Sequence, residues 1–378
     1  MKKILFCITS RADFSLAYPI IKEFKKIKKF KILISTSGYL SGNKYGKKIR
    51  LVKDKIKKID FEIKNHPLDD NNFEITKSLS KGILSFSNIF KKKKPDFMFV
   101  FADKYEMLAP VIASLQYSIP ICHVEGGDVT EGAIDDNIRH SITKLSHLHF
   151  VSTKEYKNRL IQLGEEKWRI KTVGSPSLDL IKKINFKTKN ELSKIYNFNA
   201  NKDFILCTFH PVTNEISNTS KYISNLLQSL KKTKFPIIFT SPNADQSRSI
   251  ITQQIKKFVR KNKNSLYIEK QPYIDYLSLM RHSNFMIGNS SSGIIESATT
   301  KTKVINIGNR QKGRIMPRNV INSKYNVADI KKKIYQISKL RVKFNNPYYK
   351  KNSSLKILRF FVKNLNRGVL TKKFYDIK

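Results

Sequence analysis

Short apolar runs alternate with amphipathic stretches along the first half of the chain. Residues 15–26, 106–115 and 136–145 carry apolar positions at helical spacing, for example Leu16, Ile20 and Phe24. Apolar runs of strand length lie at residues 4–9, 31–36, 97–101, 120–123 and 149–152. Strands that alternate with helices in this way predict an α/β fold with a parallel, doubly wound sheet.

The same alternation begins again near Phe204. Further strands are expected at residues 204–209, 236–240, 265–268, 285–287 and 304–307, with helices between them. We therefore predict two similar α/β domains, at residues 1–180 and 181–350, that face each other across a cleft. A helical pattern within residues 351–378 predicts a tail that packs back on the domains.

The charge of the chain raises the question of nucleic-acid binding. Among 378 residues, 73 are basic and 29 are acidic, which gives a net charge of +44. However, 59 of the basic residues are Lys and 14 are Arg, and the Lys residues are spread over the whole length. Bidentate recognition of phosphate or guanine favours Arg. The composition therefore predicts solvated Lys on helix faces, a mild attraction for anionic substrates and no nucleic-acid partner.

The three cysteines indicate neither a metal site nor a disulfide framework. Cys7, Cys122 and Cys207 each lie in an apolar run, and no C-x-x-C pair occurs. They are expected to be buried, reduced thiols. The apolar run after Met1 is too short for a signal-peptide core, and no run reaches transmembrane length. We therefore expect a soluble, cytoplasmic protein without a membrane partner.

The densest group of ionisable side chains follows the expected strand at residues 120–123. In open α/β sheets, ligands bind at the carboxyl ends of the strands. Two glycines there let the backbone turn sharply and let a ligand come close. Carboxylates and histidines gathered in a cleft can have shifted pKa values and move protons. The group consists of His123, Glu125, Asp128, Asp135, Asp136, Arg139 and His140.

Three more polar segments follow expected strands. Residues 10–13 precede the first helix, where Asp13 could cap the helix and Arg11 is placed to meet a phosphate or a carboxylate. Asp103 comes directly after the strand at 97–101, and His210 follows the strand at 204–209. A histidine after a strand is usually structural. Here, however, His210 is expected to face the carboxylates of the other domain, and this favours a functional role for His210.

A loop rich in serine and glycine follows the strand at 285–287 and opens a helix. Small residues expose backbone N–H groups at a helix N-terminus, which is an anion-binding arrangement. The hydroxyls add donors for a diphosphate, and Glu296 is placed to accept hydrogen bonds from ribose hydroxyls. Arg310 and Arg314 would complement phosphates. The loop matches neither the P-loop nor the dinucleotide fingerprint. Its expected nucleotide-binding residues are Ser290, Ser291, Ser292, Gly293 and Glu296.

Together these segments resemble the UDP-N-acetylglucosamine 2-epimerases, and within them the hydrolysing branch of sialic and legionaminic acid biosynthesis. The run at residues 131–140 is especially characteristic. The other matching segments are 10–13, 103–106, 123–130, 210–215, 242–245, 288–296 and 310–314. The resemblance implies a glycosyltransferase-B-like fold of two Rossmann-like domains. It also implies a homo-oligomer, a dimer or tetramer, and chemistry without a metal or nicotinamide cofactor.

The family also implies a mechanism. UDP leaves C1 while the C2 proton is removed, which gives a 2-acetamidoglucal; water then adds to C1, and a proton returns to the other face of C2. The resemblance assigns acid, base or charge-stabilising roles to Asp103, Glu125 and Asp135, with Asp136 as the alternate for Asp135. His210 would stabilise the leaving diphosphate, and Arg11 would join the serine loop at the nucleotide. Further candidates for substrate contacts are Asp13, Asp136, Arg139, His140 and Arg310.

Two positions depart from the family pattern. Members often carry a histidine after the second strand, where this chain has Tyr39, which cannot supply a cationic imidazole. Lys104 stands where arginine is commoner, which keeps the charge and loses the fork geometry. The leading substrate is UDP-N-acetylglucosamine. The alternative substrate is the UDP or GDP derivative of 2,4-diacetamido-2,4,6-trideoxyglucose. Two other kinds of protein stay open as alternatives: an ordinary glycosyltransferase of the same fold and, from another class, a basic nucleic-acid-binding protein.

Overall fold

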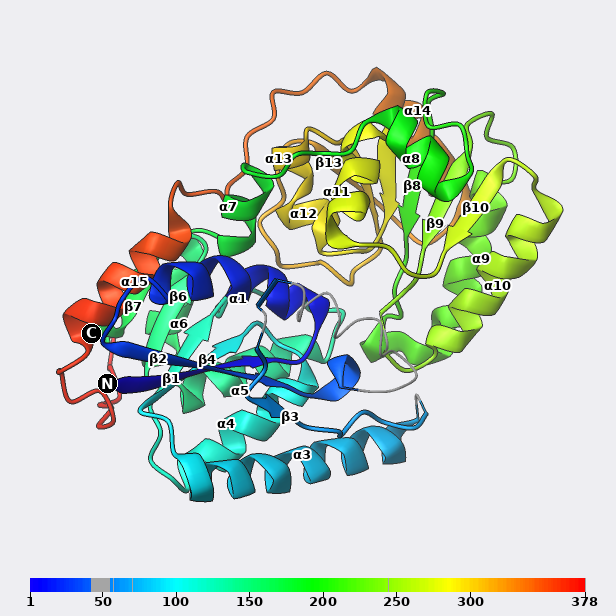
Figure 1. The fold of residues 1–378 in the computed structure, drawn as a ribbon. Coiled ribbons are helices and arrows are strands. Elements are labelled where there is room, and N and C mark those ends of the chain that lie inside the picture. The colour runs from blue at the N-terminus through cyan, green and yellow to red at the C-terminus, as the bar shows by residue number, and fades with distance from the viewer. Residues whose placement is uncertain (42–54, 57, 70, 244, 378) are drawn as a thin grey trace. The chain divides into compact units, whose positions relative to one another are not determined.

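The computed structural model describes residues 1–41, 55–56, 58–69, 71–243 and 245–377. The chain divides into two compact units. The N-terminal unit comprises Met1–Asp128, Asp135–Leu180 and Tyr348–Lys378, and the C-terminal unit comprises Val129–Ile134 and Ile181–Pro347. Each unit is a Rossmann-like α/β structure, drawn in Figure 1.

The N-terminal unit is built on a parallel sheet with the strand order β3-β2-β1-β4-β5-β6-β7. Its strands are β1 (Lys2–Ile8), β2 (Phe30–Thr36), β3 (Phe61–Glu62), β4 (Phe97–Phe101), β5 (Ile121–Val124), β6 (Leu148–Val151) and β7 (Ile170–Thr172). Its helices are α1 (Arg11–Phe24), α3 (Asn72–Lys93), α4 (Leu108–Leu115), α5 (Asp135–Leu145), α6 (Lys154–Gln162), α7 (Pro176–Ile181) and α15 (Ser353–Asn364).

The helix of the C-terminal tail completes the core of the N-terminal unit. In Figure 1, α15 lies beside α1 on one face of the sheet, while α3 and α4 lie on the other. Phe361 of α15 packs its ring 4.9 Å from Phe97 and 5.3 Å from Phe24. Phe99 lies under the same ring and stacks 4.8 Å from Phe6. These aromatic contacts explain why residues far apart in the sequence fold together, since each buried ring removes a large apolar area from water.

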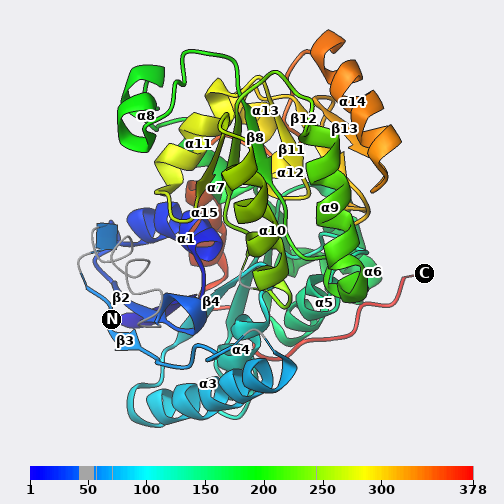
Figure 2. The ribbon, with the colours of Figure 1, turned by 90° about the vertical axis from the view of Figure 1, so that its right-hand side faces the viewer.

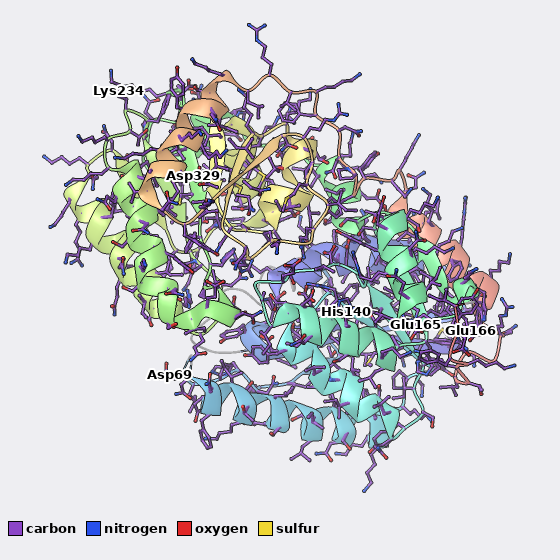
Figure 3. The ribbon with its side chains drawn as sticks, turned by 180° about the vertical axis from the view of Figure 1, so that it is seen from behind. Asp69, His140, Glu165, Glu166, Lys234 and Asp329 are labelled. Atoms are coloured by element: carbon purple, nitrogen blue, oxygen red, sulfur yellow. The ribbon has the colours of Figure 1, made fainter. Side chains whose placement is uncertain are left out.

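The segment after α15 is fastened by a buried ionic group. Glu165 is fully buried, and its carboxylate accepts hydrogen bonds from His149 at 2.9 Å and from Lys372 at 2.9 Å. Burial alone raises the pKa of Glu165, but the bonds from His149 and Lys372 outweigh it and hold the pKa at about 2. Arg169 adds a hydrogen bond to the carbonyl of Val369 at 2.7 Å. Figure 3 shows Glu165 beside this terminal segment.

The C-terminal unit has a parallel sheet with the strand order β10-β9-β8-β11-β12-β13. Its strands are β8 (Ile205–Thr208), β9 (Ile237–Thr240), β10 (Ser265–Ile268), β11 (Phe285–Gly288), β12 (Val304–Ile307) and β13 (Val320–Ser323). Its helices are α8 (Lys189–Tyr196), α9 (Thr219–Leu230), α10 (Arg248–Lys261), α11 (Tyr273–His282), α12 (Ser292–Ile295), α13 (Ser297–Thr300) and α14 (Val327–Lys339).

Two separate apolar clusters cover the two faces of this sheet. One contains side chains of α9, α10 and α14, such as Leu226, Ile251 and Ile337. The other contains side chains of α8 and α11, such as Leu192 and Leu279. Figure 2 shows α9 and α10 side by side on the first face. Burial on both faces explains why the strands are continuous apolar runs rather than alternating ones.

The predicted α/β class and all ten predicted strands are confirmed. Three short strands, β3, β7 and β13, were missed, because each lies at the edge of its sheet and carries few apolar residues. The long helix α3 was also missed, since only four of its residues are buried. The cysteines Cys7, Cys122 and Cys207 are buried and free, as expected. Within the described part of the chain, the structure contains no helix with the length and hydropathy of a membrane span.

Candidate active site

The strand order of the N-terminal unit reverses between β1 and β4. From β1 the chain proceeds outward to β2 and β3, and from β4 it proceeds the other way to β7. In open parallel sheets, such a switch point opens a crevice at the carboxyl ends of the two strands. Arg11 and Asp13 lie in the first turn of α1, directly after the loop that follows β1, and the loop after β4 carries Asp103. The structure therefore brings the sequence-predicted residues to the edge at which open parallel sheets generally bind ligands.

The loop after β1 is closed by a capping box. Asp13 is buried, and its Oδ2 accepts the Thr9 hydroxyl at 2.6 Å and the backbone N–H of Ser10 at 2.8 Å. The Ser10 side chain in turn accepts the N–H of Asp13, so helix α1 begins at Arg11. The helix predicted from residue 15 therefore starts earlier. The N-cap is Ser10 rather than Asp13, which is the third helical residue and completes the box. A contact of Asp13 with substrate stays a prediction.

Arg139 organises the carboxylates of the N-terminal unit. Its guanidinium is fully buried and donates through Nε to Asp103 Oδ2 at 3.0 Å, with a second bond from Nη2 to the same oxygen. Nη1 donates to Asp136 Oδ1 at 3.0 Å and to the carbonyl of Asp128 at 3.0 Å. One cation thus joins the loop after β4, the loop after β5 and helix α5. This planar fork is the geometry for which arginine is suited.

The two neighbouring aspartates of α5 have different partners. Asp136 is bound by Arg139, and its other oxygen lies 3.7 Å from His140 Nε2. Asp135 lies 3.6 Å from the Lys104 ammonium. Burial lowers the pKa of His140, which Figure 3 labels on α5. Asp136 is thus paired with the buried guanidinium and Asp135 with Lys104 at a longer distance, and the role of Asp135, or of its alternate Asp136, in proton transfer stays a prediction.

Glu125 stands in a strained turn at the end of β5. Its φ of 68° lies in the left-handed region, and Ala102, at the end of the neighbouring β4, has a φ of 52°. Such backbones cost about 1–3 kcal/mol per non-glycine residue and cluster at functional sites. Glu125 is buried, its N–H donates to the carbonyl of Phe150 at 2.9 Å, and its Oε2 accepts the Ser152 hydroxyl at 2.5 Å. The carboxylate is therefore held in one orientation.

His123 is a structural residue. It is fully buried, with Nε2 2.9 Å from the carbonyl of Ala102 and Nδ1 3.1 Å from the Thr143 hydroxyl. Since a carbonyl only accepts, Nε2 carries the proton and Nδ1 accepts from Thr143. Burial lowers the pKa of His123 to about 3. The ring is thus neutral, and it holds the strained turn at Ala102 in place.

We expect acid to destabilise the protein through its buried histidines. Burial lowers the pKa from 6.5 to about 3 for His123 and to about 4 for His147. As the pH falls, both histidines are therefore protonated in the unfolded chain at a higher pH than in the folded protein. Their contribution is complete above about pH 6.5 and is lost as the pH falls, by up to about 1.4 kcal/mol per pH unit for each histidine. Urea unfolding at a series of pH values measures this slope.

The variant His123→Gln is the comparison for this prediction. It is less stable at neutral pH, because the imidazole contacts are lost, but its free energy of unfolding changes less steeply below about pH 6.5. Equal slopes for the two proteins would contradict a neutral His123 in the folded state.

In the C-terminal unit, the loop after β11 passes directly beside β8. Gly288 has a φ of 143°, and a Cβ atom there would lie 1.9 Å from the carbonyl oxygen of Thr208, so only glycine fits. The next residue, Asn289, is fully buried. Its Oδ1 accepts the N–H of His210 at 2.7 Å, and its Nδ2 donates to the carbonyl of His210 at 2.9 Å. Asn289 thus fixes the backbone of His210 against the serine loop.

The ring of His210 is also fixed. The backbone N–H of Asn243, in the loop after β9, donates to its Nδ1 at 2.9 Å. A neutral His210 therefore carries its proton on Nε2 and presents a hydrogen-bond donor. The residue is buried at the carboxyl end of β8, where the strand order of this unit reverses between β8 and β11. This position suits the role of stabilising a leaving diphosphate.

The predicted nucleotide residues lie together after β11. Ser290 and Ser291 lead into α12, Ser292 and Gly293 are its first residues, and Gly293 packs against Val304. Glu296 is buried, which raises its pKa, while hydrogen bonds from Ser292 and Tyr273 act in the opposite direction. The Tyr273 hydroxyl donates to Glu296 Oε1 at 2.7 Å.

Arg310, in the loop after β12, supports the serine loop. It is buried and donates to the carbonyl of Asn289 at 3.2 Å, and Gln311 donates to the same oxygen at 3.0 Å. The structure therefore shows a supporting role for Arg310 beside the predicted substrate contact.

Sequence reasoning missed four residues that hold the site in place: Ser152, Tyr273, Asn289 and Gln311. Asn289 stood inside a segment already singled out, but no local pattern indicates that its amide would bind His210. Ser152 and Tyr273 lie 27 and 23 positions from the glutamates that they contact. Only the folded sheet brings such pairs together.

The two Rossmann-like units, each with polar loops at the carboxyl ends of parallel strands, define an α/β protein of the glycosyltransferase-B-like fold class. The family model described as UDP-N-acetylglucosamine 2-epimerase matches residues 23–362, and the chain belongs to this family.

Characterised relatives cover most of the chain. It is 39% identical to the GDP/UDP-N,N'-diacetylbacillosamine 2-epimerase (hydrolyzing) of Campylobacter jejuni, over 87% of this chain and 86% of that protein. It is 32% identical to the polysialic acid biosynthesis protein P7 of Escherichia coli, over 100% and 98% of the two chains. It is 31% identical to the UDP-N,N'-diacetylbacillosamine 2-epimerase (hydrolyzing) of Legionella pneumophila, over 92% of each.

Solved structures share the fold. The UDP-GlcNAc 2-epimerase from Neisseria meningitidis bound to UDP-GlcNAc has a TM-score of 0.83 at 18% identity, over 96% of this chain and 100% of that chain. The UDP-GlcNAc 2-epimerase of Methanocaldococcus jannaschii, in complex with UDP-GlcNAc and UDP, has a TM-score of 0.79 at 19% identity, over 96% and 99%.

Proposed function

We propose that this protein is a hydrolysing 2-epimerase of a UDP- or GDP-linked 2-acetamido sugar, and that its product enters the biosynthesis of a nonulosonic acid. The observation that carries the proposal is the group of one glutamate and three aspartates in the N-terminal unit. Glu125 is buried in a strained turn, and Asp103, Asp135 and Asp136 are held by Arg139 and Lys104. A nucleotide-binding protein without bond-making chemistry has no use for such a cluster.

The reaction follows from what these groups do. The C2 proton of the sugar is only weakly acidic, but it becomes removable as the C1–O bond breaks and positive charge grows on the ring. A carboxylate stabilises that charge and takes the proton. The bonding electrons of C1–O leave with the nucleoside diphosphate, towards which His210 presents its Nε2 proton. Water then adds to C1, and a proton returns to the opposite face of C2.

The substrate is proposed from the relatives. Those at 39% and 31% identity are named for N,N'-diacetylbacillosamine, whereas the UDP-N-acetylglucosamine 2-epimerase of Neisseria meningitidis is 29% identical. This supports the 2,4-diacetamido-2,4,6-trideoxyglucose nucleotide as the first substrate, ahead of UDP-N-acetylglucosamine, which led on the residues alone. The choice between UDP and GDP is part of the same test.

Incubation with the UDP- and GDP-linked diacetamido sugars and with UDP-N-acetylglucosamine is expected to release the nucleotide and a free, 2-epimerised sugar from one of them. In D₂O the product should carry deuterium at C2, because the original proton is lost and replaced. NMR of the product and an assay of released nucleoside diphosphate measure both events.

Three outcomes would contradict the proposal. A product that keeps its original C2 proton would exclude elimination. A nucleotide-linked epimer without released diphosphate would indicate the non-hydrolysing reaction. Transfer of the sugar to an added acceptor would indicate a glycosyltransferase.

A further inference from the structure

Residues 129–134, here called the bridging segment, belong to the C-terminal unit although both of their neighbours in the chain belong to the N-terminal unit. The chain leaves the N-terminal unit after Asp128 and re-enters it at Asp135. Both flanking residues are part of the carboxylate group described above. The carbonyl of Asp128 accepts from Arg139, and Asp135 begins α5 and faces Lys104.

The C-terminal unit holds this segment by its backbone. The N–H of Glu131 donates to the carbonyl of Lys312 at 3.1 Å, and the carbonyl of Glu131 accepts from the Asn214 amide at 3.0 Å. The N–H of Ile134 donates to the Thr213 hydroxyl at 2.9 Å. Hydrogen bonds to the backbone fix the path of the chain independently of its side chains. The segment is therefore held in a defined position and not only buried.

Close packing reinforces these bonds. Gly132 is buried, and a Cβ atom there would lie 2.8 Å from Arg310 Cα and 2.8 Å from the carbonyl oxygen of Asn309. On the other side of the contact, Gly313 has a φ of 93°, and a Cβ there would lie 2.2 Å from Val129. Gly132 lets two backbones approach each other, and backbone cannot move aside as a flexible side chain can, while Gly313 leaves room for the Val129 side chain.

The loops that hold the segment are the same loops that support the proposed nucleotide site. Thr213 and Asn214 follow His210 in the loop after β8, and Arg310 lies in the loop after β12. His210 and Arg310 are both bound to Asn289, which opens the serine loop. Asn289 therefore connects the serine loop to the two loops that hold the bridging segment.

We infer that the bridging segment couples nucleotide binding in the C-terminal unit to the position of Asp128 and Asp135 in the N-terminal unit. Gly132, Thr213 and Asn214 are then positioning residues for the carboxylates. This inference rests on the proposed function for its consequence in catalysis, but the coupling itself is measurable without any turnover.

Hydrogen–deuterium exchange with UDP or GDP as the probe tests the coupling. In the wild-type protein, saturating nucleotide should slow amide exchange in peptides that cover residues 129–140. In Thr213→Val, which removes the acceptor for the Ile134 N–H while keeping the side-chain shape, nucleotide should still bind with an affinity within about threefold, and the slowing at 135–140 should be lost. Gly132→Ala should act in the same way through its clash with Arg310, if it folds.

Lys312→Met is the matched control. Its ammonium forms an exposed pair with Glu131 at 2.7 Å, while the bond that holds the segment uses the Lys312 carbonyl, which any residue retains. Exposed pairs contribute little, so the control should behave as the wild type. The Thr213→Val enzyme should show a kcat about 10-fold lower with little change in KM, as expected when a reacting group is misplaced.

The outcomes separate the two proposals. Nucleotide binding that leaves exchange at 135–140 unchanged in the wild type, or slowing that persists in Thr213→Val, overturns the coupling. Slowing that the variants abolish, in a protein that turns over none of the nucleotide sugars, supports the coupling and overturns the proposed reaction instead.

Discussion

Replacing Glu125 by Gln is expected to lower kcat by about 10²–10⁴-fold, the usual effect of one positioned acid or base. Gln keeps the size of the side chain and an oxygen that accepts the Ser152 hydroxyl, so the strained turn after β5 stays in place. What is lost is the carboxylate that would take the C2 proton. Steady-state turnover with the preferred nucleotide sugar measures kcat, and calorimetry with the free nucleoside diphosphate measures its affinity.

Glu296→Gln is the matched control for this prediction. Glu296 lies in the C-terminal unit, where it accepts a hydrogen bond from Tyr273 beside the serine loop. Its change is expected to weaken nucleoside diphosphate binding and to leave kcat near the wild-type value once substrate saturates. A Glu125→Gln enzyme with normal kcat, or one that loses nucleotide binding as severely as Glu296→Gln, would contradict the division into a chemical N-terminal unit and a nucleotide-binding C-terminal unit.

Arg139→Met is expected to lower the free energy of unfolding by about 3 kcal/mol and to abolish most activity. Breaking a buried pair by removing one partner costs about 3–5 kcal/mol, and the lower end applies because Asp103 and Asp136 are 14% and 24% exposed. Activity falls as well, since the guanidinium holds Asp103, in the loop after β4, against Asp136 of α5. Denaturant unfolding at neutral pH and steady-state kinetics measure the two effects.

Two further variants make this test specific. Arg139→Lys keeps one positive charge but cannot bridge two carboxylates, so it should recover part of the stability and little of the activity. Arg281→Met removes an exposed guanidinium that stacks 4.5 Å from the Phe186 ring, and its effect should stay within about 0.5 kcal/mol. An Arg139→Met protein as stable as Arg281→Met would contradict the organising role of the buried guanidinium.

The order of strands and helices could be predicted from the sequence because it depends on local patterns. Apolar runs such as 97–101 and 285–287 are buried on both faces of a sheet, so their composition alone marks them as strands. The location of the site could be predicted for a related reason. Parallel strands place their carboxyl ends at one edge, so Arg11, Asp103 and Glu125 were expected there from their positions after strands.

Edge strands and the long helix α3 could not be predicted in this way. The edge strands β3, β7 and β13 are short and partly exposed to solvent. Their hydrophobic pattern is therefore too weak to distinguish them from loops. From the sequence Asp13 was the candidate cap of the first helix, whereas in the structure Ser10 is the N-cap and Asp13 completes the capping box.

By itself, the sequence determined the fold class, the two sheets and the family, because these depend on periodicity and on short motifs. The tertiary structure alone decided which charges pair, namely Asp136 with Arg139 and Asp135 with Lys104. It also decided that a neutral His123 bonds to the carbonyl of Ala102. It also decided that residues 129–134 belong to the C-terminal unit and residues 348–378 to the N-terminal unit. Some of these contacts join residues that are distant in the chain, and others distinguish two adjacent aspartates. Packing in three dimensions therefore selects them, and no local sequence pattern does.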